Sequence, residues 1–184
     1  ALAFDYDVEG HRTFRIITPD SAGNAIFTEY AYDPAGRLHS LLDGTVSPIP
    51  FRYSWHTDGG FLAALVYPSG MSVSYAYDQQ RRLLDVVATS VQGTQLGRFA
   101  YAYSSGGLRL KETTSSHTEY LAYDDKRQLV SVRRVAGVGA AEPDRSWDYE
   151  YDAVGNRQRS GDLSGVRDYT VNLVNQYTAI HGID

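Results

Sequence analysis

The sequence repeats one short motif, an aromatic-x-tyrosine pair followed by aspartate and, within five residues, by glycine and arginine. The second aromatic residues of successive copies lie roughly 20 to 28 residues apart, a period that accommodates two strands and two turns. Such a period constrains the fold strongly, because each unit can bury its apolar side chains only against its neighbours. The motif residues are Tyr6, Asp7, Gly10, Tyr30, Tyr32, Asp33, Gly36, Arg37, Tyr53, Tyr75, Tyr77, Asp78, Tyr101, Tyr103, Tyr123, Asp124, Tyr149, Tyr151, Asp152, Gly155 and Arg157.

Some copies depart from this pattern. The copy at Phe51-Arg52-Tyr53 lacks the aspartate and precedes an expanded turn at Asp58-Gly59-Gly60. Asp78 leads into Arg81 without a glycine, and Ser104 stands in place of an aspartate. A truncated last unit begins at Tyr169. The whole chain, residues 1–184, therefore reads as a single array of about seven to eight repeats, and we expect it to be a fragment of a larger protein.

The residues around each motif alternate with the period of a strand. Phe99, Tyr101 and Tyr103 share one face, while the alanines between them take the other face. A second apolar stretch follows each motif, as at residues 83–87 and 129–132, and predicts a returning strand. The alternation breaks between Tyr120 and Tyr123, which predicts a β-bulge. Each repeat is therefore predicted to be one antiparallel hairpin.

The residue types of the motif suit a tight turn. The aspartate can accept hydrogen bonds from backbone N–H groups two or three residues later, and glycine supplies a positive φ at no steric cost. Tyrosines of successive hairpins are expected to stack on one another as a ladder of rings. With 15 tyrosines, 17 glycines and no cysteine, the fold class is predicted to be all-β. An open sheet of about 15 strands is expected to curve or spiral.

The motif resembles that of the Rhs/YD-repeat family, most completely at Tyr32-Asp33-Pro34-Ala35-Gly36-Arg37-Leu38 and at residues 151–157, and its copies cover nearly the whole chain. The resemblance implies spiralling β-sheet shells, which enclose a C-terminal toxin in bacterial Rhs proteins and insecticidal toxin complexes. In the animal adhesion proteins called teneurins, such repeats form a barrel. The resemblance implies that this chain is a non-catalytic segment of the shell of a secreted or cell-surface bacterial protein. No convincing copy of the family's self-cleaving core is found, since Asp33-Pro34-Ala35-Gly36 lies inside an ordinary repeat.

Chemical roles for the motif residues are less favoured than structural ones. The aspartates occupy the same place in successive turns, which favours turn capping over catalysis or a calcium array, although the adjacent pair Asp124-Asp125 leaves calcium open. The five histidines lack metal-site spacing. The sequence therefore predicts no enzyme activity, no cofactor and no metal. Packing is the favoured role of Trp55 and Trp147, with sugar stacking as the alternative.

The predicted partners follow from charge and from the open ends of a sheet. A net charge of -5 disfavours nucleic acid, and no apolar stretch is long enough for membrane insertion. Further repeats of the parent chain and an enclosed toxin cargo are the expected partners. Open sheet edges predict self-association of the isolated chain. The alternative function is a cell-surface adhesion module that binds carbohydrate or another protein.

Overall fold

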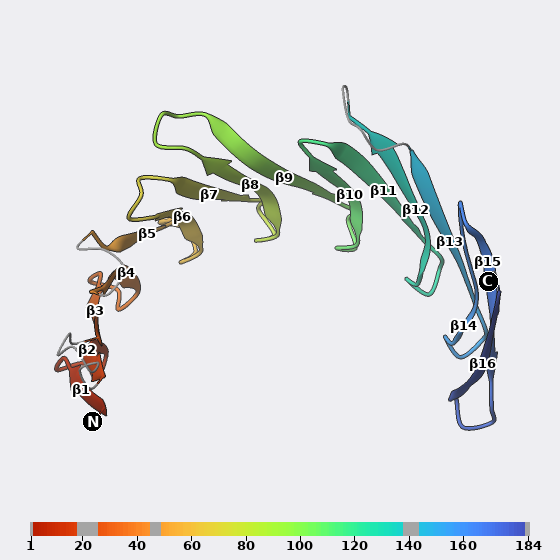
Figure 1. Cartoon of the computed structure of the whole chain (residues 1–184), viewed down its shortest axis with the longest axis horizontal. Helices are drawn as coiled ribbons and strands as arrows, with labels where there is room; N and C mark the ends of the chain where they lie inside the picture. The colour runs from red at the N-terminus through yellow and green to blue at the C-terminus, as the bar shows by residue number, and fades with distance from the viewer. Residues whose placement is uncertain (1, 18–25, 45–48, 138–143, 183–184) are drawn as a thin grey trace. The chain divides into compact units, whose positions relative to one another are not determined.

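The computed structural model describes residues 2–17, 26–44, 49–137 and 144–182, and these residues form strands and turns without a helix. The strands are β1 (Leu2–Tyr6), β2 (Arg12–Ile17), β3 (Ile26–Tyr32), β4 (Leu38–Asp43), β5 (Phe51–Trp55), β6 (Leu62–Val66), β7 (Ser72–Tyr77), β8 (Leu83–Thr89), β9 (Gln95–Tyr103), β10 (Arg109–Thr114), β11 (His117–Tyr123), β12 (Leu129–Ala136), β13 (Arg145–Tyr151), β14 (Arg157–Asp162), β15 (Gly165–Val171) and β16 (Tyr177–Gly182). They follow chain order in one open sheet (Figure 1). The predicted all-β class, built from tandem antiparallel hairpins, is confirmed.

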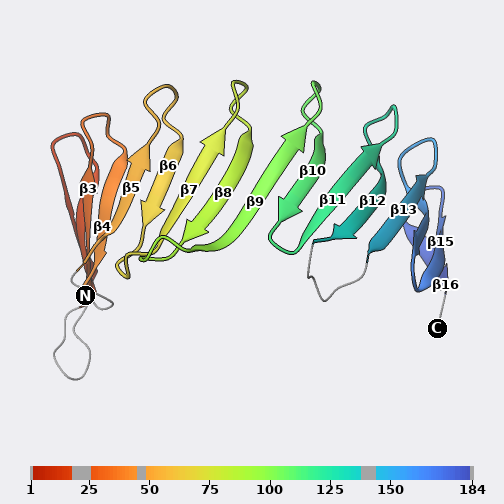
Figure 2. The ribbon, with the colours of Figure 1, turned by 90° about the horizontal axis from the view of Figure 1, so that it is seen from above.

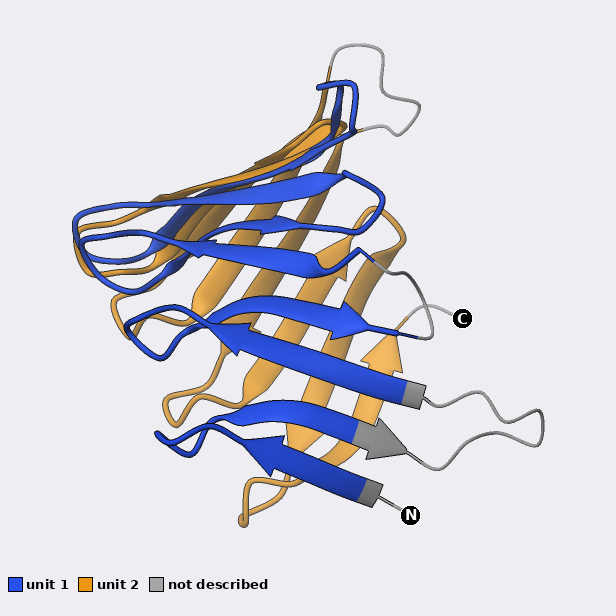
Figure 3. Ribbon diagram, turned by 90° about the vertical axis from the view of Figure 1, so that its left-hand side faces the viewer, with its two compact units in different colours: residues 1–97 blue, residues 98–184 orange. Residues whose placement is uncertain are grey.

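The chain divides into two compact units, Ala1–Gly97 and Arg98–Asp184 (Figure 3). Within each unit the strands lie side by side in a single layer. The turns inside the hairpins lie along one edge of each unit, and the connections between hairpins lie along the other (Figure 2). The motif turns of a unit are therefore neighbours in space, although they are far apart in sequence.

Among the described residues, each of the eight hairpins carries the same irregularity next to the second aromatic position of the motif, which Val171 occupies in the last hairpin. In the β3–β4 hairpin, Ala31 pairs with Ser40 and Tyr32 pairs with Leu38, so that His39 is the extra residue of a β-bulge. The bulge is thus a standard part of the repeat, on the returning strand just after the turn.

The bulge expected near Tyr120 and Tyr123 lies instead on the partner strand. Ala122 pairs with Ser131 and Tyr123 pairs with Leu129, which leaves Val130 as the extra residue. Strand β11 itself is regular, with Leu121 opposite Val132. The break in the sequence pattern therefore reflects an aromatic residue, Tyr120, on the exposed face, where it is 48% exposed, and it does not mark a special hairpin.

One face of the sheet is aromatic and half-buried. In β7, Tyr75 and Tyr77 are half-buried, whereas Ser74 and Ala76 are exposed. Strand β13 shows the same alternation between Trp147, Tyr149 and Tyr151 and the polar residues between them. We call the side that carries these rings the aromatic face.

The described residues include no buried hydrophobic side chain. The side chains that are buried are polar, namely Thr28 and Ser160. A single layer of strands leaves both faces of each unit without a second layer to pack on, so no closed core forms within the described part of either unit. None of the described elements is a helix of the length and apolarity that crossing a bilayer requires.

Candidate functional site

The motif turn is a compact hydrogen-bonded unit, and the Asp33 turn shows all of its parts. The Asp33 N–H donates to the carbonyl of Arg37 at 2.9 Å, and the Gly36 N–H donates to the carbonyl of Asp33 at 2.9 Å. Asp33 Oδ1 accepts the backbone N–H groups of Ala35 and Arg37, at 2.9 and 3.0 Å. The carboxylate therefore closes the turn by satisfying backbone donors that the ladder leaves free.

The other motif carboxylates hold the same position. Each accepts the backbone N–H of the residue four positions later, at distances of 2.7 to 2.9 Å, in the turns of Asp7, Asp78, Asp124 and Asp152. In the copy that lacks an aspartate, Ser104 Oγ accepts the N–H of Leu108 at 3.1 Å. Asn172 Oδ1 accepts the N–H of Gln176 at 3.0 Å in the last hairpin. Degenerate copies thus keep the turn geometry with a different acceptor.

A side-chain pair that sequence reasoning missed links the two ends of the turn. The second carboxylate oxygen of Asp33 accepts the Arg37 Nε at 2.8 Å, and that of Asp152 accepts the Asn156 Nδ2 at 2.8 Å. The equivalent pairs are Asp7 with His11 and Asp78 with Arg82. In the last hairpin the direction is reversed, because Asn172 Nδ2 donates to Gln176 Oε1 at 3.0 Å. The identity of the donor four residues after the aspartate changes from copy to copy, which hid the pair in the sequence.

These hydrogen bonds shift the ionisation of the carboxylates. The side chain of Arg37, followed by its backbone N–H, holds the pKa of Asp33 below its ordinary value of 3.8. The side chain of Asn156 is the leading cause of the lowered pKa of Asp152. The charged form is therefore the one that the folded turn stabilises.

Arg37 and Arg157, which the sequence analysis treated as equivalent, occupy different positions. Arg37 pairs with Asp33 of its own turn at 2.7 Å. Arg157 is the first residue of β14 and lies opposite Tyr151. Its guanidinium is 4.7 Å from the centre of the Tyr149 ring, a cation–π contact on the aromatic face.

The glycine position of the motif has a positive φ, for example 72° at Gly36 and 96° at Gly155. Three residues with side chains occupy the same position in other turns, with φ values of 68° at Arg81, 66° at Arg127 and 60° at Asn175. For a residue with a Cβ this conformation costs on the order of 1 kcal/mol or more. At this position, the Arg127 Nη2 donates a hydrogen bond to the carbonyl of Gly106, at 2.6 Å.

The second motif aromatic joins its hairpin to the preceding one. The Tyr32 hydroxyl donates to the carbonyl of Arg12 at 2.9 Å in the first unit. In the second unit, the hydroxyls of Tyr123 and Tyr151 donate to the carbonyls of Arg109 and Leu129, each at 2.9 Å. Every acceptor is the first residue of a returning strand, next to the bulge, where the ladder is locally disrupted. We call this contact the inter-hairpin hydrogen bond.

The expected ladder of stacked tyrosines takes a different form. The Tyr32 ring stacks on His11 of the preceding turn, with centroids 4.7 Å apart, and the Tyr77 ring lies 5.1 Å from that of Phe61. Tyr169 meets Tyr177, which belongs to the same hairpin. The tyrosine ring therefore connects the hairpins in two ways. Its hydroxyl bonds to a backbone carbonyl, and its face packs on the preceding turn.

The third copy is shifted by two residues from its predicted place. Trp55, and not Tyr53, lies at the register shift of the β5–β6 hairpin. The Trp55 Nε1 donates to the carbonyl of Leu38 at 2.9 Å, which is the inter-hairpin hydrogen bond of this copy. Arg37 lies 5.7 Å from the Trp55 ring centre. Trp55 is therefore engaged in packing, as favoured by the sequence analysis over sugar stacking.

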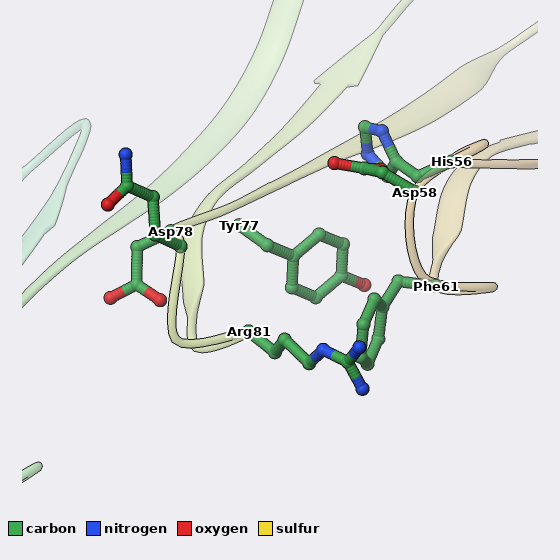
Figure 4. A pocket seen from close by; sticks show the side chains of 7 residues that line it. His56, Asp58, Phe61, Tyr77, Asp78 and Arg81 are labelled. Atoms are coloured by element: carbon green, nitrogen blue, oxygen red, sulfur yellow. The ribbon is translucent and has the colours of Figure 1, made fainter.

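A hollow of about 230 Å³ lies beside the expanded turn of the first unit (Figure 4). Its lining comes from the β5–β6 turn and from the following motif turn, and consists of His56, Asp58, Phe61, Tyr77, Asp78, Gln79 and Arg81. Within the described residues the Tyr77 hydroxyl has no hydrogen-bond partner, in contrast to the hydroxyl of Tyr32. This step of the array therefore lacks the tyrosine-to-carbonyl bond.

One group of potential metal ligands occurs among the described residues, formed by Asp7, Glu9 and His11, whose ligand atoms lie within 4.8 Å of one another. Asp7 Oδ2 and His11 Nδ1 are 3.0 Å apart and form the pair that closes their own turn. The group is thus explained by the turn motif. Asp124, where the sequence left calcium open, uses Oδ1 to accept the N–H of Gln128.

Comparison of the sequence with family models and with curated proteins gives no match. Solved structures do match. The Photorhabdus luminescens Tc holotoxin pore with a TccC3 mutation is 15% identical, with a TM-score of 0.72 over 93% of this chain and 10% of that chain. The TcdB2-TccC3 complex is 13% identical, with a TM-score of 0.56 over 91% of this chain and 12% of that chain. The TcdB2-TccC3-Cdc42 complex is 14% identical, with a TM-score of 0.55 over 92% of this chain and 12% of that chain.

The likeness is one of fold. The predicted repeat fold, which the sequence motif indicated, is shared with Tc toxin structures that contain TccC3 or TcdB2. The chain spans about a tenth of the length of the solved chains that it matches.

Proposed function

We propose that this chain is a non-catalytic segment of a β-sheet shell of the Rhs/YD-repeat kind, within a secreted or cell-surface bacterial protein. The observation that carries the proposal is the regular joining of hairpins, in which Tyr32, Tyr123 and Tyr151 bond to the first carbonyl of a preceding returning strand. A contact that recurs between successive hairpins in both units suits a wall of many hairpins. The shared fold with Tc toxin structures over 93% of the chain supports the same role.

The half-exposed aromatic face supports a place within a larger assembly. Among the described residues no hydrophobic side chain is buried, and rings such as Phe99 and Tyr177 are 46% and 52% exposed. Burial of apolar area contributes about 25 cal/mol per Å². Covering this face, and pairing the outer edges of β1 and β16 with further strands, would therefore stabilise the sheet. Further repeats of the parent chain are the proposed partners, and an enclosed toxin polypeptide is the proposed cargo.

The hydrogen bonds that the motif carboxylates accept within their own turns support a structural role over a catalytic one. Asp33 and Asp152 each accept two backbone N–H groups and one side-chain donor. A general acid or base needs a free proton position facing a substrate. The same arrangement in successive turns suits a repeated structural task.

Protease protection tests the proposal on the full-length product of the gene that encodes this chain. Trypsin is expected to spare the polypeptide enclosed by the shell in the wild type, and Ile180→Pro in β16 is expected to expose it, because proline removes a backbone donor from the strand. Ile180→Val, the matched control, keeps protection. Equal cleavage of the enclosed polypeptide in the wild type and in Ile180→Pro would overturn the proposal.

A further inference from the structure

The turn between β5 and β6 is built differently from the motif turns around it. His56 stands where they have aspartate, and its N–H donates to the carbonyl of Phe61, five residues later, at 2.8 Å. In the Asp33 turn the equivalent bond spans four residues. The extra residue gives Asp58, Gly59 and Gly60 a wider loop, and the hollow lies against it.

The hollow has an aromatic wall. The rings of Phe61 and Tyr77 are 5.1 Å apart and inclined by 38°, and His56 meets Tyr77 edge to face at 5.7 Å. Figure 4 shows Phe61 and Arg81 flanking the Tyr77 ring. A wall of rings offers apolar area to the C–H groups of a bound molecule.

Polar groups of complementary kinds surround that wall. The Asp58 carboxylate is exposed and makes no hydrogen bond within the described residues. The Tyr77 hydroxyl also has no partner there, and partial burial raises its pKa, so it is a protonated donor at neutral pH. A carboxylate only accepts, a guanidinium only donates, and a phenol does both. Asp58, Tyr77 and Arg81 together can therefore satisfy a ligand that carries several hydroxyl groups.

Arg81 holds its place at a conformational cost. Its φ of 68° lies in the left-handed region, where the equivalent residue of the Asp33 turn is Gly36. The guanidinium lies 5.5 Å from the centre of the Phe61 ring, at the edge of the hollow. The turn therefore keeps a charged group at the edge of the hollow.

We propose that this hollow binds a single sugar ring, with the C–H face of the sugar on Phe61 and Tyr77 and its hydroxyl groups on Asp58, the Tyr77 hydroxyl and Arg81. The volume of about 230 Å³ lies below the range of roughly 300 to 1,000 Å³ for drug-sized ligands, which suits one ring. The mixture of one free acceptor, one cation and one phenol suits a neutral polyol better than an ion. The site goes beyond the shell role, since a wall needs no ligand.

Titration of the ¹⁵N-labelled chain with the methyl glycosides of glucose, galactose, mannose and N-acetylglucosamine tests the site. At least one glycoside is expected to shift the amide resonances of Gly60 and Phe61, with a dissociation constant on the order of 1 mM for so small and open a hollow. Phe61→Ala and Asp58→Asn are each expected to weaken binding about tenfold, and Tyr77→Phe severalfold.

Matched variants outside the hollow separate binding from general effects on the fold. Phe4→Ala removes another ring that lies under an arginine, at 4.4 Å from Arg12, and Asp125→Asn removes another exposed turn carboxylate. Both are expected to bind the glycoside as the wild type does. The proposal is overturned if no glycoside shifts these resonances at 50 mM, or if Phe61→Ala and Asp58→Asn, shown to be folded by circular dichroism, bind with unchanged affinity.

Discussion

The Asp33 turn and the His56 turn, neighbours in the first unit, differ in how they are closed and in how the next hairpin contacts them. The Asp33 turn is closed by a carboxylate, and at the step after it Trp55 Nε1 of the next hairpin donates to the carbonyl of Leu38. At the step after the His56 turn, the contact comes from the turn itself, because His56 Nε2 lies 3.1 Å from the carbonyl of Tyr75. The Tyr77 hydroxyl has no partner among the described residues.

The difference links the wider turn of the first unit to the loss of the inter-hairpin hydrogen bond at the next step. At Arg12, Leu38, Arg109 and Leu129, each after a four-residue closure, the first carbonyl of the returning strand accepts a hydrogen bond from the next motif tyrosine or, at Leu38, from Trp55. One added residue moves the closure to Phe61, and the tyrosine of the following hairpin is left facing a hollow instead.

The largest expected difference between the two turns concerns their carboxylates. Asp33→Ala removes the acceptor of two backbone N–H groups and of Arg37, and is expected to lower the Tm by about 5 °C. Asp58→Ala in the expanded turn is expected to leave the Tm unchanged, because Asp58 bonds to no described residue. Differential scanning calorimetry measures both variants. A similar loss from both would contradict the account of the turns.

A smaller difference is expected between two tyrosine hydroxyls. Tyr32→Phe deletes a hydrogen bond and is expected to destabilise the chain by about 1 kcal/mol. Tyr77→Phe deletes no bond within the described residues and is expected to be neutral. Urea unfolding, followed by tryptophan fluorescence at low protein concentration, compares the two. If Tyr77→Phe costs as much as Tyr32→Phe, the inter-hairpin hydrogen bond is not what separates these steps.

The glycine position of the turns offers a third comparison. Gly36→Ala forces a Cβ into a positive φ of 72°, with the His11 ring 3.1 Å away, and is expected to cost about 1 kcal/mol. Arg81→Gly relieves the equivalent strain, but it also frees the unfolded chain, so that a change below about 1 kcal/mol is expected. The urea midpoints of the two variants measure this. Equal losses would show that φ does not limit the residue at this position.

The smallest expected effect is a pH dependence confined to the closed turns. The folded-state pKa of Asp33 is lowered by Arg37, so its charged form contributes stability above the unfolded pKa of about 3.9, and that stability is lost as pH falls through the folded pKa. The stability difference between the wild type and Asp33→Asn is therefore expected to be constant above about pH 5 and to shrink below about pH 4. Unfolding curves of both proteins from pH 3 to 7 measure this difference, and a difference that stays constant down to pH 3 would contradict the account.

The sequence predicted the strands, the hairpins and the turn acceptors, because these depend on neighbouring residues. Alternation of aromatic residues sets the face of a strand, and an aspartate followed by glycine sets a turn. The pairing of Asp33 with Arg37 was not found, since its donor varies among histidine, arginine and asparagine. Sequence alone could not reveal it without the turn geometry.

Contacts between hairpins were harder to predict. The motif tyrosines were expected to meet one another, whereas Tyr32 and Tyr151 meet a carbonyl that is exposed by a bulge on another strand. The bulge itself is a matter of register, and the break in alternation at Tyr120 has another cause, a ring on the exposed face. The shift from Tyr53 to Trp55 follows from the same register.

Cryo-electron microscopy of the full-length gene product tests the central claim most directly. As a segment of a continuous wall, this chain is predicted to have the outer edges of β1 and β16 hydrogen-bonded to further strands. A map in which both edges face solvent, with the segment standing as a separate domain, would contradict the account.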